Sequence, residues 1–263
     1  MKISVIIVNH NTSGLVRDCV ASLRRHVKPL PEIIVVNNGT DRYRDKSVKV
    51  INLDHNIGFG ASNNMGAQKA TGDILWFLNS DTLLVDGSMI LFFEYVAHHK
   101  DVGVATPLLY RETECRILQS DFYAKRQTLV TLLGRRAKPK VSIEHQDLVP
   151  VDVVVGASMV MRREVFEKLG GFDAQIFMYM EDDDLCYRAQ KAGYKVGVFT
   201  GARVVHLRGG SISKNRDRKK LYYQSQNYFW RKHYGIFSMW LMRILRWPLK
   251  SWRLYRGQPS GKS

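Results

Sequence analysis

Two short stretches of the sequence place polar and acidic residues directly against apolar ones. Residues 74–78 form an apolar run that continues into the polar residues 79–82, and about a hundred residues later Tyr179 and Met180 lead into four consecutive acids at 181–184. A carboxylate at the mouth of a buried strand loses its hydration at a cost in free energy unless it meets a cation. The two stretches therefore indicate a metal site or a catalytic proton transfer.

Asp81 in the first stretch has two interpretations. A short Ser-Asp-Thr segment after a strand is commonly a simple turn or a helix cap. Next to two other strand ends that also carry polar residues, the same carboxylate is a candidate ligand for Mg²⁺ or Mn²⁺. His206 follows the last predicted strand, and only a neighbour such as Asp81 would make it a candidate ligand rather than an incidental polar residue.

The second stretch also has a structural interpretation, because acids in the first turn of a helix are favoured by its dipole. Four in a row exceed what capping requires, and like charges this close raise one another's pKa, which suits a general base. Asp184 stands one helical turn before Arg188, a spacing typical of a structural ion pair. Asp182 or Glu181 is then left for chemistry.

A glycine-rich segment at residues 56–63 has an open interpretation as well. It lacks the third glycine of a dinucleotide fingerprint, where Asn63 stands, and it lacks the acidic partner. The segment is either a turn that caps a helix or a loop whose backbone approaches a nucleotide or sugar, with Asn63 and Asn64 as hydrogen-bonding arms.

The elements that must position these residues alternate along the chain. Strands are predicted at residues 3–8, 32–36, 48–53, 73–78, 102–106, 151–155 and 195–199, and helices at 14–27, 61–70, 86–99, 163–169 and 181–192. This alternation predicts an α/β fold with a mostly parallel sheet flanked by helices. The polar residues follow the strands, at the carboxyl ends where open α/β sheets bind ligands.

Composition narrows the class of protein. The 263 residues, 45% of them apolar, can bury a full core, and three widely spaced cysteines match neither a disulfide framework nor a zinc site. The short apolar run at residues 3–8 predicts a strand rather than a signal peptide, so a cytoplasmic protein is expected. From Arg203 onward fifteen Lys and Arg stand against one acid, so this segment carries +14 of the net charge of +16. It predicts an anionic partner: nucleic acid, lipid or a phosphate-bearing substrate.

The carboxyl-terminal residues 236–256 combine aromatic and basic side chains. Four cations recur at helical spacing opposite an apolar face that includes Phe237 and Trp240, with Trp247 and Trp252 further along. This pattern predicts a helix lying in a membrane interface, with a kink at Pro248. The alternative is a helix packed on its own domain with a solvated basic face.

Six ordered motifs carry a resemblance to a known family: residues 5–9 (VIIVN), 32–39 (EIIVVNNG), 56–66, 78–82 (LNSDT), 170–173 (GGFD) and 181–185 (EDDDL). Together they resemble the family-two inverting glycosyltransferases of GT-A fold, in particular the rhamnosyltransferase-like branch that builds bacterial surface polysaccharides. The resemblance covers roughly residues 1–212, and the ordered set is far more specific than any one motif.

The resemblance implies roles for the matching residues. Asp182, with Glu181 beside it, would be the catalytic base, and Asp81 and His206 would hold Mg²⁺ or Mn²⁺ on the donor diphosphate. The nucleotide pocket would be lined by Asn9, Asn11, Asn37, Asn38, Gly39, Gly58, Phe59, Asn63, Asn79 and Ser80. The metal would stabilise the departing nucleoside diphosphate while the base takes a proton from an acceptor hydroxyl that attacks the opposite face of the sugar.

Two positions depart from the family pattern. The family often has aspartate where this chain has Asn37, whose amide can still pair with the imide edge of uracil or thymine. The aspartate-x-aspartate metal motif appears as residues 79–81, with Asn79 in the first position, which removes one anionic ligand.

The resemblance also implies partners and domains. A dTDP- or UDP-linked sugar, with rhamnose as the expected sugar, would be the donor and a lipid-linked saccharide the acceptor. The expected organisation is a GT-A domain at residues 1–212, with a nucleotide-binding half at 1–106 and an acceptor half at 107–212, and a basic amphipathic helical tail at 213–263. The tail would hold the protein peripherally on the anionic inner face of the plasma membrane, and no nucleic acid is expected.

Two rival functions share some of these features. A sugar nucleotidyltransferase would also combine an α/β sheet, a metal and a nucleotide, but it predicts a basic phosphate-binding loop after the first strand, where no Lys or Arg precedes Arg17. A non-enzymatic nucleic-acid-binding protein would use the basic tail, and its binding would weaken with salt.

Overall fold

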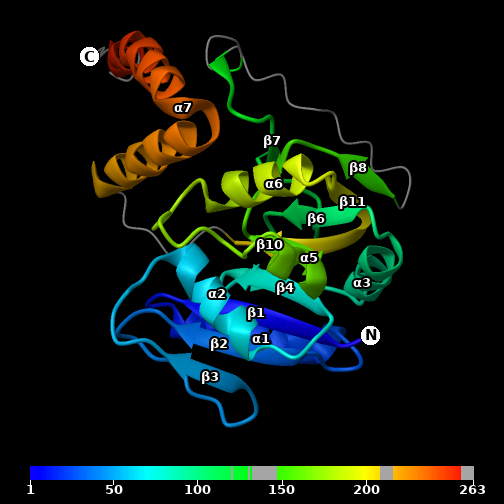
Figure 1. Cartoon of the computed structure of the whole chain (residues 1–263). Coiled ribbons are helices and arrows are strands. Elements are labelled where there is room, and N and C mark those ends of the chain that lie inside the picture. The colour runs from blue at the N-terminus through cyan, green and yellow to red at the C-terminus, as the bar shows by residue number, and fades with distance from the viewer. Residues whose placement is uncertain (120, 130, 132–146, 208–215, 256–263) are drawn as a thin grey trace, which may run out of the picture.

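The computed structural model describes residues 1–119, 121–129, 131, 147–207 and 216–255, with side chains of the last helix given for residues 218–246. A mixed β-sheet with strand order β3-β2-β1-β4-β10-β6-β11-β5 forms its centre, and helices flank the sheet (Figure 1). The predicted α/β class with a mostly parallel sheet is confirmed.

The amino-terminal half is a run of parallel strands and crossover helices. Its elements are β1 (Ile3–Asn9), α1 (Ser13–His26), β2 (Glu32–Asn37), β3 (Lys49–Asn52), α2 (Phe59–Lys69) and β4 (Ile74–Asn79). β1 pairs in parallel with β2 on one side and β4 on the other. Almost every residue of these three strands is buried, which explains their continuous apolar runs. All the predicted elements of this half are present, with small shifts at their ends.

The second half adds antiparallel pairing. Its elements are β5 (Thr82–Leu83), α3 (Met89–His98), β6 (Val102–Tyr110), β7 (Tyr123–Ala124), β8 (Leu148–Pro150), β9 (Val153–Val154), β10 (Ser158–Arg162), α5 (Arg163–Lys168), α6 (Glu181–Lys191), β11 (Lys195–His206) and α7 (Arg216–Tyr255). The sequence predicted neither β10 nor the extension of β11 to His206. β10 lies antiparallel between β4 and β6, and all five of its residues are buried, so no alternation marks it as a strand.

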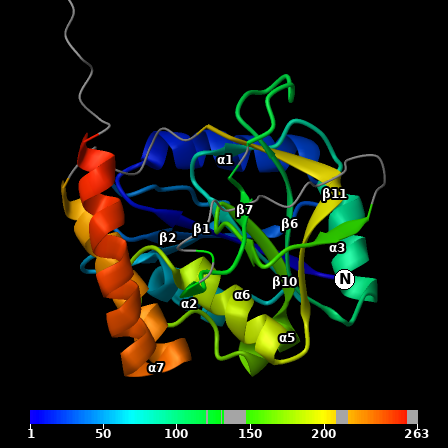
Figure 2. The same ribbon diagram turned by 90° about the horizontal axis from the view of Figure 1, so that it is seen from above.

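The core has two layers, one on each face of the sheet. Helices α1 and α3 lie on one face and α2, α5 and α6 on the other (Figure 2). Successive residues of β4 supply both layers, because side chains alternate along a strand. Trp76 meets Phe93 of α3 edge to face at 5.2 Å, whereas Phe77 packs on Phe166 of α5 at 4.9 Å.

The carboxyl-terminal helix α7 is interrupted at Gly235, whose φ of 84° is not helical. The break therefore falls well before Pro248, where the sequence predicted a kink. Arg246 of the second segment donates a hydrogen bond to Gln226 Oε1 of the first at 2.7 Å, so the two segments lie side by side (Figure 1). No helix within the described ranges has the length and apolarity to cross a bilayer.

Candidate active site

Polar residues from three neighbouring strands meet at one edge of the sheet. β1, β2 and β4 end in asparagines, with Asn9 in register with Asn37 and Asn79 one step away beside Val8. The loops that follow these strands carry the polar and acidic residues singled out in the sequence. The predicted gathering of polar residues at the carboxyl ends of the strands is present.

The amides of Asn9 and Asn37 are fully engaged within the protein. Asn9 Nδ2 donates to Asn37 Oδ1 at 2.8 Å and to Asp41 O at 2.7 Å, while its Oδ1 accepts two hydrogen bonds from Thr12. Asn37 donates to Tyr43 O and to Asn52 Oδ1 and accepts from the Tyr43 N–H. In this arrangement the Asn37 amide has no donor or acceptor left to pair with a base.

Asn11 shapes the next loop. It adopts a left-handed conformation with φ of 59°, and its Oδ1 accepts from the backbone N–H groups of Thr40 at 2.8 Å and Asp41 at 2.9 Å. A Cβ on Gly39 would lie only 2.6 Å from that oxygen, which explains the glycine. Asn11 and Gly39 therefore fix the backbone of the loop after β2.

Asn38 and Gly58 hold the glycine-rich loop against the sheet. Asn38 Oδ1 accepts from the Ile57 N–H at 2.9 Å, and its Nδ2 donates to Asn56 Oδ1 at 2.9 Å. Gly58 has φ of 90°, and a Cβ there would collide with the carbonyl of Phe177. One interpretation of this segment was a backbone that closely approaches a nucleotide or sugar. In the structure, the group that lies close to Gly58 is the backbone of Phe177, before α6.

The residues at the start of α2 are structural in their contacts. Asn63 donates to Phe59 O at 3.1 Å, and Asn64 exchanges two hydrogen bonds with the backbone of Phe172. The Phe59 ring packs edge to face on the Phe172 ring at 6.5 Å. Of the two predicted hydrogen-bonding arms, Asn64 joins α2 to the segment after α5, whereas Asn63 bonds within α2.

Asp81 and His206 lie side by side because β5 pairs antiparallel with the end of β11, bringing Thr82 opposite His206. His206 Nε2 lies 3.3 Å from Asp81 Oδ1, and both residues are buried. The described residues contain no group of three or more His, Cys, Asp and Glu around a common point. A cation here would therefore be held by one carboxylate, one imidazole, and oxygens of a diphosphate or water, a set that fits Mg²⁺ or Mn²⁺.

Sequence reasoning missed Gln119. Its side chain is completely buried, and His206 Nδ1 lies 3.1 Å from its Oε1. Its Nε2 is buried with no hydrogen-bond partner among the described residues. Nothing in the sequence marks this glutamine, because it follows β6 in an irregular segment far from Asp81 and His206 along the chain.

Glu181 and Asp182 open α6. The two residues before them, Tyr179 and Met180, have φ of 67° and 71°, which is uncommon for residues other than glycine and marks local strain. Burial raises the pKa of Glu181 well above its usual range, and the charge of Asp182 adds to the effect. Burial also raises the pKa of Asp182, although backbone N–H groups stabilise its carboxylate. Burial, rather than repulsion between the neighbouring carboxylates, is the main cause of both raised pKa values.

One turn links the two acidic stretches. The Gly156 N–H donates to Asp182 Oδ2 at 3.2 Å, and the carbonyl of the next residue, Ala157, accepts from the Asn79 N–H at 2.9 Å. The turn at residues 156–157 precedes β10, the strand that the sequence did not predict. Asp182 therefore lies at the same edge of the sheet as the residues that follow β4.

Asp184 has the structural role that its spacing predicted. Its Oδ2 accepts from Arg188 Nε at 2.7 Å, and its Oδ1 contacts Lys232 Nζ and His233 Nε2, each at 2.7 Å. Burial alone would raise the pKa of Asp184, but these three partners lower it to about 2. Because Lys232 and His233 belong to α7, Asp184 ties the tail to α6.

The first segment of α7 packs on the domain, while the second keeps an apolar face exposed. Met239 and Met242 are buried in a cluster with Phe229 and Trp230. The opposite face exposes residues at helical spacing, with Phe237 88% exposed. The exposed apolar face consists of Ile236, Phe237, Trp240, Leu241 and Ile244. The alternative of a tail packed on its own domain therefore holds for the first segment and for one face of the second.

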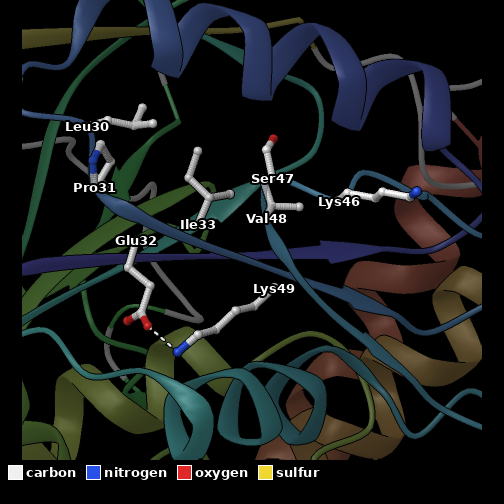
Figure 3. A pocket seen from close by; sticks show the side chains of 8 residues that line it. All are labelled: Leu30, Pro31, Glu32, Ile33, Lys46, Ser47, Val48 and Lys49. Carbon is white, nitrogen blue, oxygen red and sulfur yellow. Dashed lines mark hydrogen bonds and ion pairs between the residues drawn. The ribbon is translucent and has the colours of Figure 1, made fainter.

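A cavity of about 320 Å³ lies away from all of these residues. It is lined by residues 30–33 and 46–49, at the amino ends of β2 and β3, where Lys49 and Glu32 form an ion pair at 2.5 Å (Figure 3). Because the candidate site lies at the carboxyl ends of the strands, this cavity is separate from it.

The sequence is similar to known glycosyltransferase families and to a named relative. A family model described as "Glycosyl transferase family 2" matches residues 4–170, and one described as "N-terminal domain of galactosyltransferase" matches residues 141–209. The chain is 27% identical over 226 residues to the rhamnosyltransferase WbbL of Escherichia coli, covering 77% of this chain and 82% of that protein.

Other relatives match over part of their length. The chain is 27% identical over 234 residues to the O-antigen biosynthesis protein RfbC of Myxococcus xanthus, covering 80% of this chain but only 18% of RfbC. It is 33% identical over 103 residues to the N-acetylglucosaminyl-diphospho-decaprenol L-rhamnosyltransferase of Mycobacterium tuberculosis, covering 38% of this chain and 32% of that protein.

A solved structure shares the fold. GalNAc-T7, crystallised with UDP, GalNAc and Mn²⁺, superposes with a TM-score of 0.65 at 18% identity, covering 88% of this chain and 51% of that one. The central sheet and its helices are therefore those of the GT-A glycosyltransferases.

Proposed function

Because the chain belongs to glycosyl transferase family 2, we propose that it is an inverting, metal-assisted glycosyltransferase that moves a sugar from a nucleoside diphosphate to a lipid-linked saccharide. The observation that carries this proposal is the turn at residues 156–157, which brings a carboxylate of raised pKa to the sheet edge that ends in Asn79 and Asp81. Rhamnose is the proposed donor sugar because two relatives are named rhamnosyltransferases.

The nucleotide would bind against the loops that follow β1 and β2. Asn9, Asn11, Asn37 and Asn38 hold these loops in place, and Gly39 lets them approach closely. Since the Asn37 amide is fully engaged, we assign recognition of a uracil or thymine base to backbone groups of the loops. These asparagines then shape the pocket, whereas direct contact with the ligand falls to the backbone.

Asp81 and His206 would hold the divalent cation. When bound, such a cation neutralises charge on the departing diphosphate. Asp81 and His206 lie 3.3 Å apart at the end of β11, so the protein offers two candidate ligands side by side. Asn79 leaves the site one carboxylate short of the usual motif, and the donor diphosphate would supply the remaining anionic oxygens.

Asp182 would act as the general base, with Glu181 beside it in a supporting role. Asp182 is partly exposed and so can reach an acceptor hydroxyl, whereas Glu181 is buried. The N–H groups of Gly156 and Asp183 fix the carboxylate of Asp182. A pKa raised by burial brings it closer to neutral pH, where a base is most effective. It would take the proton while the hydroxyl attacks the anomeric carbon from the side opposite the diphosphate, which inverts its configuration.

The acceptor would reach the site from a membrane surface. The exposed apolar face of α7 is flanked by cations, and the guanidinium of Arg243 stacks over the Trp240 ring at 4.3 Å. An apolar face with aromatic and basic residues suits the boundary between head groups and acyl chains of anionic lipids. We propose that this face binds the membrane that carries the lipid-linked acceptor, on its cytoplasmic side.

Site variants test the proposal directly. With dTDP-rhamnose or UDP-sugars as donors, Asp182→Asn and Asp81→Ala should each lower turnover by a factor of about 10² or more, because each removes a group that acts in the transition state. Asp101→Asn is a matched control, since this exposed acid pairs with Lys195 at the amino ends of β6 and β11, whereas the candidate site lies at the carboxyl ends of the strands. Full activity of folded Asp182→Asn and Asp81→Ala proteins would show that the assignment of the site is wrong.

A further inference from the structure

Gln119 joins the candidate metal site from an element that no sequence motif includes. Its backbone N–H donates to Leu109 O at 2.7 Å, which ties it to β6, the neighbour of β11 in the sheet. Its side-chain oxygen accepts the hydrogen bond from His206 Nδ1 at 3.1 Å. The glutamine is thus placed behind the histidine, on the side away from Asp81.

This hydrogen bond determines which tautomer a neutral His206 imidazole adopts. An amide oxygen can only accept, so Nδ1 of His206 carries the hydrogen, and of the two neutral tautomers this is the one whose Nε2 lone pair faces Asp81 Oδ1, 3.3 Å away. In that tautomer the Nε2 lone pair and the Asp81 carboxylate are both groups that can ligate a cation. Metal-bound histidines commonly donate their second N–H to such an outer partner.

The other end of the amide is unsatisfied. Gln119 Nε2 is buried and has no acceptor within the described parts of the chain. A buried donor without an acceptor is costly, so a residue that keeps one beside a ligand site is expected to gain its acceptor with the ligand. The anionic oxygens nearest to a cation on Asp81 and His206 would be those of the donor diphosphate.

We propose that Gln119 is a positioning and binding residue of the glycosyl-transfer site. Its Oε1 orients His206 toward the cation, and its Nε2 donates a hydrogen bond to the terminal phosphate of the nucleoside diphosphate. This inference rests on the proposed function, because it requires the cation and the diphosphate to bind at Asp81 and His206. The neutral amide would stabilise the leaving group without adding charge to the site.

Two variants separate the two ends of the amide. Gln119→Glu keeps an oxygen that can accept from Nδ1 but replaces the donor with an anion, whereas Gln119→Met removes both functions at similar volume. Binding of Mn²⁺, UDP and UMP to the full chain would be measured by calorimetry, with thermal unfolding as the check on folding. Gln119→Glu should weaken Mn²⁺-dependent UDP binding by about tenfold or more and leave UMP binding unchanged. Gln119→Met should also weaken Mn²⁺ binding about tenfold.

The outcomes distinguish this inference from the proposed function. If Asp81→Ala abolishes Mn²⁺-dependent UDP binding while both Gln119 variants bind as the unmodified protein does, only the role of Gln119 is overturned. Equal loss of UDP and UMP binding in Gln119→Glu would also overturn it. If Asp81→Ala binds Mn²⁺ and UDP normally, the proposed function itself fails. Nitrogen NMR of the unmodified protein gives an independent test, because a neutral His206 should carry its hydrogen on Nδ1, and the other tautomer would contradict the inference.

Discussion

The contact between Asp184 and the tail makes a quantitative prediction about stability. Asp184 is 0% exposed, and although burial opposes its ionisation, His233, Arg188 and Lys232 lower its pKa from 3.8 to about 2. At 1.36 kcal/mol per pKa unit, this difference corresponds to about 2.5 kcal/mol of folding free energy. Because the folded pKa is depressed, the contribution is fully present above about pH 4 and is lost as the pH falls toward 2.

Asp184→Asn should therefore lower the free energy of unfolding by about 2–3 kcal/mol at neutral pH, with a smaller difference from the unmodified protein near pH 2–3. Urea unfolding at both pH values measures this difference, and hydrogen exchange in the first segment of α7 should show whether the tail opens first. The matched control is Asp101→Asn, whose exposed ion pair with Lys195 should contribute less than about 1 kcal/mol. Equal stability of Asp184→Asn and the unmodified protein at neutral pH would refute the reasoning.

Three further predictions concern the pocket, the base and the tail. Burial raises the pKa of Asp182, so its ionised form, which acts as the base, is lost at acid pH. We therefore expect kcat/KM to rise with pH through a pKa above that of an ordinary aspartate. A profile that is flat down to about pH 4 would contradict its role. Gly58→Ala should destabilise the protein by about 1–3 kcal/mol in thermal unfolding and weaken nucleotide binding, because Gly58 has φ of 90° and a Cβ there would meet the carbonyl of Phe177. Gly14→Ala is the control: it has open space around it and should be neutral or stabilising in the same assay. Replacing Phe237 and Trp240 together by serine should reduce flotation with anionic vesicles at least tenfold without changing the melting temperature; unchanged flotation, or salt-sensitive RNA binding without lipid preference, would argue against the membrane surface.

The parallel half of the fold could be predicted from the sequence because its signals are local. Each of β1, β2 and β4 contains an apolar run of at least four residues and ends in asparagine. β10 could not be predicted in this way, since its five buried residues carry no period of their own and only the neighbouring β4 and β6 give them a place. Strand pairing over long sequence distances is invisible to local patterns.

In the candidate site, too, features with a local sequence signal could be predicted, and those that depend on distant contacts could not. The position after a strand was enough to mark Asp81 as a candidate, and helical spacing was enough to pair Asp184 with Arg188. The run of acids left both Glu181 and Asp182 open, and only the family resemblance favoured Asp182. The hydrogen bonds of the Asn37 amide involve partners as distant along the chain as Asn9, so sequence alone suggested a base contact that the geometry does not leave open. The amphipathic pattern of the tail could be read, but not which of its faces the domain would cover.

The helix break at Gly235 gives the tail a second consequence. The segment before it is bound through Lys232 and His233 to α6, the helix whose first turn contains the candidate base Asp182. The segment after it carries the exposed apolar face. A protein that rests on a bilayer through this face would hold this candidate base at a set height above the lipid head groups. The tail would then select acceptors by length. A saccharide whose hydroxyl lies at that height would react, and shorter or longer saccharides on the same lipid would not.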